Sequence, residues 1–551
     1  MENKQKKLEL EITGMTCEHC ARSIENKLSN LNGVLASSID YQKGKGEVTF
    51  NGSSLDPKQV VDHVNSMSQY KVKDWTEISS DGQEAGSYDL IILGGGSAAF
   101  AAAIEADELQ LSTLIVNEGL PWGGTCVNVG CLPSKHLIRA AESIHKASHS
   151  PFKGISPNKP SWDYKTIIEQ KRDLIADLQQ HKYMDVVAGL ENVTLLEGRG
   201  RITSRNTIEV NAKTYKGIKI FIATGSSPTI PPIEGISKIK YLTNDTLFDK
   251  EELPESLTII GGGYIGLEIA QAYHRFGSRV TVVEYFDHIL NTQTEDVSDE
   301  LKKHLKAEGI QFYTGTKATK VYKQGDQVVL EGEQKGKEIS ITSSHLLIAT
   351  GRTPNTKDVG LEDVGVELLK GGFVKVNDQL KTSVSDIYAI GDCNPNPPFV
   401  YTAAYEGKTA VQNAFQAAGK ETDFRSLPWV IFTDPQIAGV GLDEKEAAAE
   451  GIPFQVVSLP LSEVPRSEAA LDTRGFIKLI KNPETDKLLG ARVIAPEGGE
   501  LIMELSLAVK YGIPVNDLAE SFHPYLTLSE GIKLAAITFY KSVDKLSCCA
   551  S

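Results

Sequence analysis

Apolar and charged residues alternate near the start of the chain. Leu8, Leu10 and Ile12 are separated by glutamates, and a period of two predicts a strand with one buried face. The apolar residues that follow recur three and four positions apart, which predicts an amphipathic helix: Ala21, Ile24, Leu28 and Leu31. Strand-like and helical stretches continue at residues 47–50 and 60–64. We therefore expect a small α+β unit here.

Two longer apolar segments lie further along the chain. Residues 88–93 and 257–260 each run directly into a cluster of glycines and then into a helical stretch. A short apolar run that ends in glycine predicts a fully buried strand. Because strand, glycine turn and helix occur together twice, the pattern predicts two doubly wound α/β domains with parallel sheets. Residues from about 426 onward carry no such motif and predict a separate α+β domain.

Length and composition restrict the class of protein. A chain of 551 residues is too long for one hydrophobic core, and the polar segment 77–87, EISSDGQEAGS, predicts a flexible linker. With 57 Lys and Arg against 72 Asp and Glu, the chain lacks the basic excess of a general nucleic-acid binder. It has neither a long apolar segment for a membrane nor the apolar run of a signal peptide. We expect a cytoplasmic protein that is not embedded in a membrane.

Both glycine clusters fit the G-x-G-x-x-G/A motif of dinucleotide-binding sites. The first glycine permits a tight turn, the second lets the backbone approach the pyrophosphate, and the third position keeps helix and strand close. The pyrophosphate then lies at the helix N-terminus, which favours an anion. In each copy an acidic residue ends the next strand, where it suits an unphosphorylated ribose. The positions are Gly94, Gly96, Ala99 and Glu118 in the first copy, and Gly261, Gly263, Gly266 and Glu284 in the second.

Two such sites imply two dinucleotides, a tightly held flavin and a mobile nicotinamide. Glu284 would repel the 2′-phosphate of NADPH, which prefers an Arg or Lys at this place. None of residues 285–288 is Arg or Lys, so we favour NADH. Arg279, which lies before the strand, leaves NADPH open.

The seven cysteines include three close pairs: Cys17 and Cys20, Cys126 and Cys131, and Cys548 and Cys549. In a reducing compartment, close pairs indicate metal binding or catalysis. In a regular helix, residues five apart are separated by a rise of about 7.5 Å, too far for a disulfide. The glycines at 123, 124 and 130 predict a bend that brings the sulfurs of Cys126 and Cys131 together. We interpret this pair as a reversible dithiol that exchanges electrons with the flavin.

Several motifs resemble the family of glutathione reductase and lipoamide dehydrogenase, the pyridine nucleotide–disulfide oxidoreductases. They are GGTCVNVGCLPSK around the central thiols, ATG at 223–225 and 349–351, and YAIGDC at 388–393. The resemblance implies a homodimer that binds FAD, with each active site completed by the C-terminal domain of the partner. It divides the chain after the linker into an FAD-binding domain, an NAD(P)-binding domain and a dimerisation domain: residues 88–228 with 351–425, residues 229–350, and residues 426–551.

The same resemblance implies roles for individual residues. Cys131 would be the thiol nearest the flavin and Cys126 the exchanging thiol. Lys135 and Glu268 would form an ion pair near the reactive N5 of the flavin, and Asp392 would bind its ribityl chain. The motifs also place Gly124, Thr125, Thr224, Gly225 and Gly351 in the cofactor-binding sites.

The segment HPYLTLSEGIKLA separates branches of the family. Disulfide-reducing members carry a histidine base five residues before a glutamate, but five residues before Glu530 lies Tyr525, not His523. Tyrosine has a pKa near 10 and is a poor base at neutral pH, although it can lie beside a bound metal. Tyr525 and Tyr264 resemble the active-site tyrosines of mercuric reductases. Cys548 and Cys549 resemble the vicinal cysteines with which those enzymes receive Hg(II).

Near the N-terminus, GMTCEHC resembles the heavy-metal-associated domain of metallochaperones and metal pumps, which implies a ferredoxin-like fold for residues 1–76. Cys17 falls at the entry to the expected helix and Cys20 on its first turn, where the helix lowers thiol pKa values. We expect His19 to be exposed rather than a ligand. Cys393 has no obvious partner, and we interpret it as packing beside the flavin.

These observations suggest a thiol relay for Hg(II). Cys17 and Cys20 would take the ion from small thiols or from an importer, and the vicinal pair of one subunit would deliver it to Cys126 and Cys131 of the other. Electrons from NADH or NADPH would then reduce it to Hg(0). Two alternatives stay open. One is an enzyme similar to lipoamide dehydrogenase with a fused metal-binding domain, and the other is a metal chaperone with a vestigial oxidoreductase body.

Overall fold

The computed structural model describes residues 5–52, 54–67, 69–78 and 84–542. The chain forms two compact units, residues 1–87 with 207–216 and residues 88–206 with 217–551. No helix among the described residues has the length and apolar character needed to cross a membrane.

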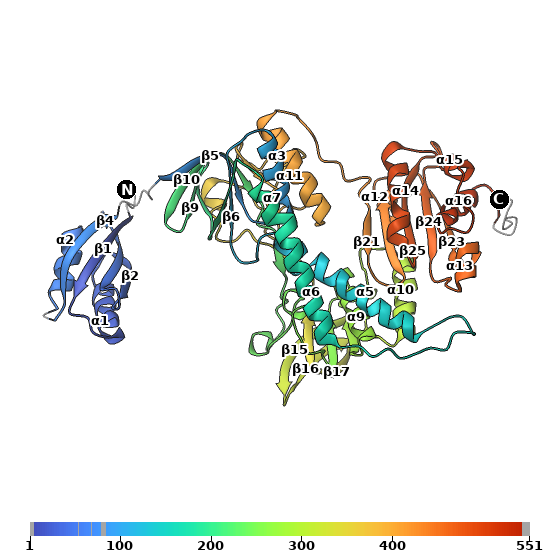
Figure 1. Cartoon of the computed structure of the whole chain (residues 1–551), viewed down its shortest axis with the longest axis horizontal. Helices are drawn as coiled ribbons and strands as arrows, with labels where there is room; N and C mark the ends of the chain where they lie inside the picture. The colour runs from blue at the N-terminus through green and yellow to red at the C-terminus, as the bar shows by residue number, and fades with distance from the viewer. Residues whose placement is uncertain (1–4, 53, 68, 79–83, 543–551) are drawn as a thin grey trace. The chain divides into compact units, whose positions relative to one another are not determined.

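The first unit has the β-α-β-β-α-β order of a ferredoxin-like fold (Figure 1). Its elements are β1 (Gln5–Thr13), α1 (Glu18–Ser29), β2 (Val34–Asp40), β3 (Lys45–Asn51), α2 (Pro57–Asn65) and β4 (Lys71–Ile78). The antiparallel sheet has the strand order β2-β3-β1-β4. Leu8 and Leu10 of β1 and Ile24 and Leu28 of α1 are fully buried in one core, which confirms both periodicities seen in the sequence.

Strands reach into both ends of the segment expected to be a linker, residues 77–87. β4 ends at Ile78 and β5 (Glu84–Leu93) begins six residues later. β5 lies in a sheet of strand order β7-β6-β5-β10-β9-β8, with β20 paired to β10. These strands are β6 (Thr113–Asn117), β7 (Val193–Glu197), β8 (Arg201–Ser204), β9 (Thr207–Val210), β10 (Lys213–Ile222) and β20 (Ile387–Ala389).

Two helices pack tightly together against the sheet that contains β5. A Cβ at Gly407 would lie 2.4 Å from the carbonyl oxygen of Ala98, so the backbones of the two helices nearly touch (Figure 1). They are α3 (Ser97–Glu108) and α11 (Val400–Phe415). The remaining helices of this region are α4 (Gly124–Asn128), α5 (Cys131–Ser148), α6 (Tyr164–Gln179), a π-helical turn (Gln180–Met184) and α7 (Asp185–Ala188).

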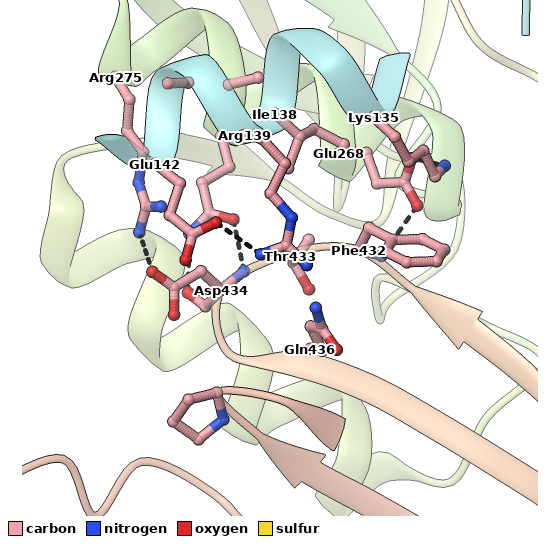
Figure 2. Close-up of a pocket in the computed structure, with 14 residues that line it drawn as sticks. Lys135, Ile138, Arg139, Glu142, Glu268, Arg275, Phe432, Thr433, Asp434 and Gln436 are labelled. Carbon is pink, nitrogen blue, oxygen red and sulfur yellow. Dashed lines mark hydrogen bonds and ion pairs between the residues drawn. The ribbon is translucent and has the colours of Figure 1, made fainter. Parts of the chain in front are cut away.

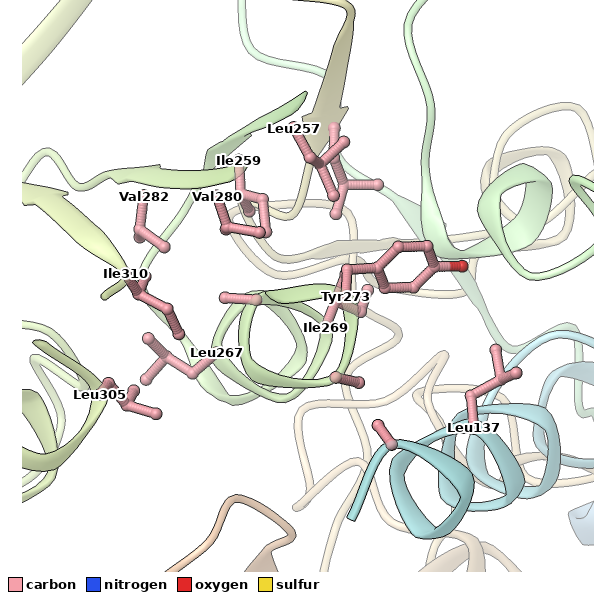
Figure 3. Packing of buried hydrophobic residues seen from close by; sticks show 14 of the residues in the cluster. Leu137, Leu257, Ile259, Leu267, Ile269, Tyr273, Val280, Val282, Leu305 and Ile310 are labelled. Carbon is pink, nitrogen blue, oxygen red and sulfur yellow. The ribbon is translucent and has the colours of Figure 1, made fainter. Parts of the chain in front are cut away.

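The second dinucleotide-binding region has a parallel sheet of order β14-β13-β12-β18 beside an antiparallel sheet β15-β16-β17. Alternate residues of β12 and β13 face two different cores. Leu257, Ile259 and Val282 pack with α9 and α10 (Figure 3), whereas Ile260 and Val283 pack with the antiparallel sheet. Burial on both faces explains the continuous apolar run.

The elements of this region are β12 (Ser256–Ile260), α9 (Tyr264–Arg275), β13 (Arg279–Val283), α10 (Glu295–Glu308), β14 (Gln311–Tyr313), β15 (Thr316–Gln324), β16 (Gln327–Gln334), β17 (Lys337–Ser343) and β18 (His345–Ile348). A short helix and two short strands lie beside it: α8 (Asn244–Leu247), β11 (Ser226–Pro228) and β19 (Arg352–Pro354).

The C-terminal region is an antiparallel sheet of order β21-β22-β25-β24-β23 with helices packed on it. Its strands are β21 (Trp429–Ile431), β22 (Gln436–Gly441), β23 (Gln455–Pro460), β24 (Phe476–Lys481) and β25 (Leu488–Ala495). Its helices are α12 (Glu444–Ala449), α13 (Pro465–Ala470), α14 (Gly498–Tyr511), α15 (Val515–Glu520) and α16 (Glu530–Ile537). The predicted fold class, two doubly wound domains with an α+β domain after them and a ferredoxin-like unit before them, is confirmed.

Candidate active site

The two glycine turns are built in the same way. Gly94 and Gly261 have φ values of +122° and +114°, and a Cβ on them would lie 2.1 and 2.2 Å from the carbonyl oxygens of Ala223 and Ala349. Only glycine fits such a turn. These alanines begin the two ATG segments, so each ATG segment lies against the glycine turn of its own domain.

Among the other glycines in these motifs, one is closely packed and three have open space around them. A Cβ at Gly266 would lie 2.2 Å from the carbonyl oxygen of Gly261, so this glycine keeps α9 close to the turn. At Gly263, Gly225 and Gly351, such a Cβ would have no described atom within 4 Å apart from those of the adjacent chain. Open backbone of this kind lets a pyrophosphate approach closely.

Glu284 is held by the protein backbone at the end of β13. Its Oε2 accepts a hydrogen bond from the N–H of Gly262 at 2.5 Å, and its Oε1 accepts one from the N–H of Phe286 at 2.9 Å. The residue is 8% exposed. The carboxylate therefore braces the glycine turn as well as facing the end of the strand. Glu118 of the first motif is exposed and lies 3.9 Å from Arg199.

The central thiols lie on either side of a break between two helices. Cys126 belongs to α4 and Cys131 begins α5, with Gly130 as the N-cap at φ −122° and ψ −109°. The side chains of the two cysteines are hydrogen bonded. The bond from Cys126 lowers the pKa of Cys131 to about 7, and the ammonium of Lys135 adds to this effect. The same bond raises the pKa of Cys126. Cys131 is therefore the thiolate of the pair.

Lys135 and Glu268 form a short ion pair next to these thiols. Lys135 Nζ lies 2.7 Å from Glu268 Oε2, and Glu268 has a side-chain exposure of 7%. Phe432 of the C-terminal region contacts both partners: its N–H donates to Glu268 Oε1 at 2.9 Å, and its ring centre lies 4.6 Å from Lys135 Nζ (Figure 2). The ion pair implied by the sequence is present, whereas the contribution of Phe432 was not foreseen.

The phenol of Tyr264 is influenced by charged residues of both dinucleotide-binding regions. It begins α9 directly after Gly263. Desolvation raises the pKa of its phenol, and the charges of Asp392 and Glu268 raise it further. Asp392 in turn accepts a hydrogen bond from Ser226 Oγ at 2.9 Å, and Ser226 Oγ accepts one from Arg352 Nε at 2.8 Å. Residues of the YAIGDC and ATGR motifs are therefore joined near Tyr264.

Two further tyrosines lie close enough to the central thiols to sense their charge. Burial and the charge of Cys131 raise the pKa of Tyr401 to about 12. Burial and the charges of both thiols raise the pKa of Tyr183. Tyr183 lies in the π-helical turn after α6 and packs edge-on against Phe100, with ring centres 4.9 Å apart. Sequence reasoning missed both residues, because neither belongs to a recognisable motif.

Tyr525 and His523 lie in the turn before α16. His523 Nε2 is 2.8 Å from Glu504 Oε1 of α14, while Glu530 Oε2 accepts a hydrogen bond from the N–H of Leu526 at 3.2 Å. The histidine is therefore engaged by Glu504, and Tyr525 is 50% exposed.

The thiol pair of the first unit lies at the start of α1. Cys17 is the N-cap, Cys20 lies on the first turn, and their sulfurs are 3.6 Å apart. Hydrogen bonds from the backbone of Thr16 and from the side chain of Tyr70 lower the pKa of Cys20 to about 6. His19 is exposed, as expected. This pair presents a reactive thiolate at the surface.

The fifth cysteine of the described part of the chain lies in its interior. Cys393 is fully buried and its thiol donates to the carbonyl oxygens of Ile222 and Ile390, each at 3.3 Å. Burial raises its pKa to about 12, so it behaves as a packing residue. Cys548 and Cys549 lie outside the described residues.

Comparison with known proteins identifies the family. Residues 88–407 match the pyridine nucleotide-disulphide oxidoreductase family, residues 427–536 its dimerisation domain, and residues 9–70 the heavy-metal-associated domain. The mercuric reductase of Bacillus cereus is 38% identical over 100% of this chain and 88% of its own length. That of Lysinibacillus sphaericus is 38% identical over 99% of this chain and 100% of its own. The chain belongs to the mercuric reductase family of pyridine nucleotide-disulphide oxidoreductases.

Two solved structures are similar to this chain over most of its length. The Cu(II) complex of the HOCl-induced flavoprotein disulfide reductase RclA from Escherichia coli has a TM-score of 0.74 and 26% identity, over 83% of this chain and 100% of that chain. LpdA from Mycobacterium tuberculosis has a TM-score of 0.73 and 28% identity, over 82% of this chain and 99% of that chain. The resemblance seen in the sequence is therefore confirmed.

Membership of the mercuric reductase family means that the chain uses FAD and a nicotinamide coenzyme, and its dimerisation domain supports the expected homodimer. The residues present fit FAD. Beside the first glycine turn, the hydroxyl of Thr224 is buried and has no partner among the described residues. A Cβ at Gly124 would lie 2.7 Å from Gly96 Cα, so the start of α4 approaches the same turn. A bound cofactor would satisfy this hydroxyl and use the bare backbone.

Proposed function

We propose that the chain reduces Hg(II) to Hg(0) at Cys126 and Cys131, with electrons from NADH that reach the thiols through bound FAD. The observation that carries the proposal is the thiol pair itself, in which a hydrogen bond and a lysine keep one sulfur ionised near neutral pH. Relatives 38% identical along the whole chain are named mercuric reductases. Two adjacent thiolates are suitable ligands for a soft, two-coordinate cation.

One thiol of the pair is already ionised near neutral pH before the ion binds. Cys131, the thiolate of the pair, would bind an incoming Hg(II) complex first, because only thiolates bind the metal. This order departs from the resemblance, which implies Cys126 as the exchanging thiol. Cys126 then loses its proton as its sulfur becomes the second ligand. Two electrons convert the bound Hg(II) to Hg(0), which leaves both cysteines as thiolates. Bound FAD would supply the two-electron link between the nicotinamide and the thiols. Gly94, Gly96, Thr224 and Asp392 are the residues that we expect to hold it.

Delivery of the ion uses the two other pairs. Cys17 and Cys20 would accept Hg(II) from a small thiol carrier or an importer, since their sulfurs are 3.6 Å apart at an exposed helix end. Cys548 and Cys549 would pass it to Cys126 and Cys131 of the partner. Each step exchanges one pair of thiolate ligands for another, so no step has to release a free ion.

The dimer would complete the active site with Tyr525 of the partner subunit. An exposed apolar stripe on α14 supports such a contact: Met503, Leu507 and Tyr511 are 50%, 47% and 70% exposed and lie four residues apart. Tyr525 and Phe522 are exposed in the same domain. Large apolar side chains on one face are typical of a protein interface.

The coenzyme that we favour is NADH. Two backbone hydrogen bonds hold the side chain of Glu284 in place. A fixed negative charge at the end of β13 opposes a 2′-phosphate in the same place. The comparison to make is the kcat/KM for NADH and for NADPH, and a preference for NADPH would contradict this assignment.

Oxidation of NADH that depends on Hg(II) tests the proposal. The wild-type enzyme with a small-thiol complex of Hg(II) should oxidise NADH and release Hg(0), and Cys126→Ala or Cys131→Ala should not. Dihydrolipoamide with NAD⁺ tests the alternative of a lipoamide dehydrogenase, which the Tyr525 position argues against. Full activity of either cysteine variant, or preferred turnover of dihydrolipoamide, would overturn the proposal.

A further inference from the structure

The ammonium of Lys135 has two partners. Glu268 Oε2 lies 2.7 Å from Lys135 Nζ, and the ring centre of Phe432 lies 4.6 Å from it. A cation over an aromatic face is attracted by the ring quadrupole. Without the ring, only one ion pair would restrain a long and flexible side chain.

Glu268 is likewise held at both oxygens. Oε2 is bound to Lys135, and Oε1 accepts the backbone N–H of Phe432 at 2.9 Å. The carboxylate is nearly buried, so its orientation depends on these two partners. One residue of the C-terminal domain therefore contacts both members of the pair, Lys135 through its ring and Glu268 through its backbone.

The loop that carries Phe432 is fixed to α9. Gln271 donates to the carbonyl oxygen of Asp434 and accepts from its N–H, each at 2.8 Å. Arg275 Nη2 binds Asp434 Oδ2 at 2.8 Å, and Arg474 Nη2 binds Asp434 Oδ1 at 2.7 Å. Glu268, Gln271 and Arg275 are three and four residues apart on α9 and therefore lie on one face of it. Three successive contacts thus align the loop with the helix, and Figure 2 shows Arg275 beside Asp434.

Little space remains between these elements. The cavity enclosed by α5, α9 and residues 432–436 has a volume of about 20 Å³, enough for about one water molecule.

We infer that Phe432 is a positioning residue of the active site, which holds the Lys135–Glu268 pair in place from the C-terminal domain. Neither the thiols nor a bound nucleotide needs to touch it. Its effect on catalysis rests on the proposed function, because the pair matters only if electrons pass beside it. Its effect on Lys135 does not depend on that function.

Chemical labelling of Lys135 tests the inference directly. The FAD-bound enzyme is treated with an amine-acetylating reagent, and mass spectrometry follows modification of the peptide that contains Lys135. Phe432→Leu removes the ring but keeps the backbone N–H to Glu268, so Lys135 should react about threefold to tenfold faster, the range expected for one cation–π contact. Phe432→Tyr keeps the ring and should restore the wild-type rate.

Phe539→Leu is a matched control. Phe539 also lies over an ion-paired lysine of the C-terminal domain: Lys481 Nζ is 4.7 Å from its ring centre and 2.6 Å from Asp486 Oδ1. This variant should leave the labelling of Lys135 unchanged. Should Phe432→Leu fail to fold, Phe432→Met keeps the side-chain volume without an aromatic face and gives the same comparison.

Two outcomes separate this inference from the proposed function. Equal labelling of Lys135 in the wild type and in the Leu and Met variants would overturn the positioning role, whatever the substrate. Faster labelling in an enzyme that does not reduce Hg(II) would support the role and contradict the function. If both hold, Phe432→Leu should shift the flavin midpoint potential and slow flavin reduction by NADH, with the KM for NADH unchanged.

Discussion

The pairs Cys17–Cys20 and Cys126–Cys131 use the same donor atoms in different surroundings. In the first, the sulfurs lie on one helix turn, and backbone and hydroxyl groups lower the pKa of Cys20 to about 6. In the second, the sulfurs lie on two helices, and the neighbouring thiol and Lys135 lower the pKa of Cys131 to about 7. The Lys135–Glu268 ion pair lies beside the second pair. We therefore propose that thiolates suffice to carry a soft ion, whereas its reduction needs the Lys135–Glu268 pair and the two nucleotide turns.

The largest difference in Hg(II)-dependent activity should appear when each cysteine pair is removed in turn. Cys131→Ser should reduce Hg(II)-dependent NADH oxidation to the background, because serine gives the ion no soft ligand. Cys17→Ser with Cys20→Ser should keep turnover of small-thiol Hg(II) complexes within about twofold of the wild type, since free complexes can reach the second pair directly. Steady-state assays with purified enzyme measure both. A comparable loss in the two variants would show that the first pair takes part in reduction.

The pH dependence of alkylation should distinguish the pairs next. A thiol whose pKa is lowered stays ionised, and therefore reactive, above that pKa and becomes protonated as the pH falls through it. Iodoacetamide should modify Cys20 with a midpoint near pH 6 and Cys131 with a midpoint near pH 7. Mass spectrometry of the reduced protein gives each rate separately. Coincident midpoints would contradict the two different causes assigned to the two shifts.

Much of this comparison could be drawn from the sequence. Glycine spacing predicted both turns, because a turn so close to Ala223 or Ala349 excludes every side chain. Cysteine spacing predicted both described pairs, and the break at Gly130 accounts for the distance that a regular helix would impose. These features are local, so short motifs report them.

Other contacts of the site could not be predicted from the motifs. Phe432 reaches Glu268 through a backbone N–H, which every residue except proline possesses, across 164 positions of chain. Tyr183 is influenced by the charges of both thiols and lies in a π-helical turn, which an apolar periodicity of 3.6 does not indicate. The bonds from Gly262 and Phe286 to Glu284 depend on how the strand ends. Such contacts are set by tertiary packing.

Removal of the Lys135 charge should slow the alkylation of Cys131 and leave that of Cys20 unchanged. Lys135→Met keeps the aliphatic chain but loses the charge that helps to lower the pKa of Cys131, so alkylation of Cys131 at pH 7 should slow by about threefold to tenfold. Alkylation of Cys20 in the same sample serves as the internal control and should not change. An unchanged rate at Cys131 would mean that the hydrogen bond from Cys126 alone accounts for its reactivity.

The smallest effect should come from Tyr70. Its hydroxyl is the second of the groups that lower the pKa of Cys20, after the backbone of Thr16, and the ring itself is buried in the core of the first unit. Tyr70→Phe keeps that packing and removes one hydrogen bond, so the alkylation midpoint of Cys20 should rise by less than about one pH unit. The rate at Cys131 should stay the same. If the midpoint of Cys20 does not move, the backbone at the helix entry is sufficient to ionise the carrier pair. Cys20 would then differ more clearly from Cys131, whose pKa is lowered by the side chains of Cys126 and Lys135.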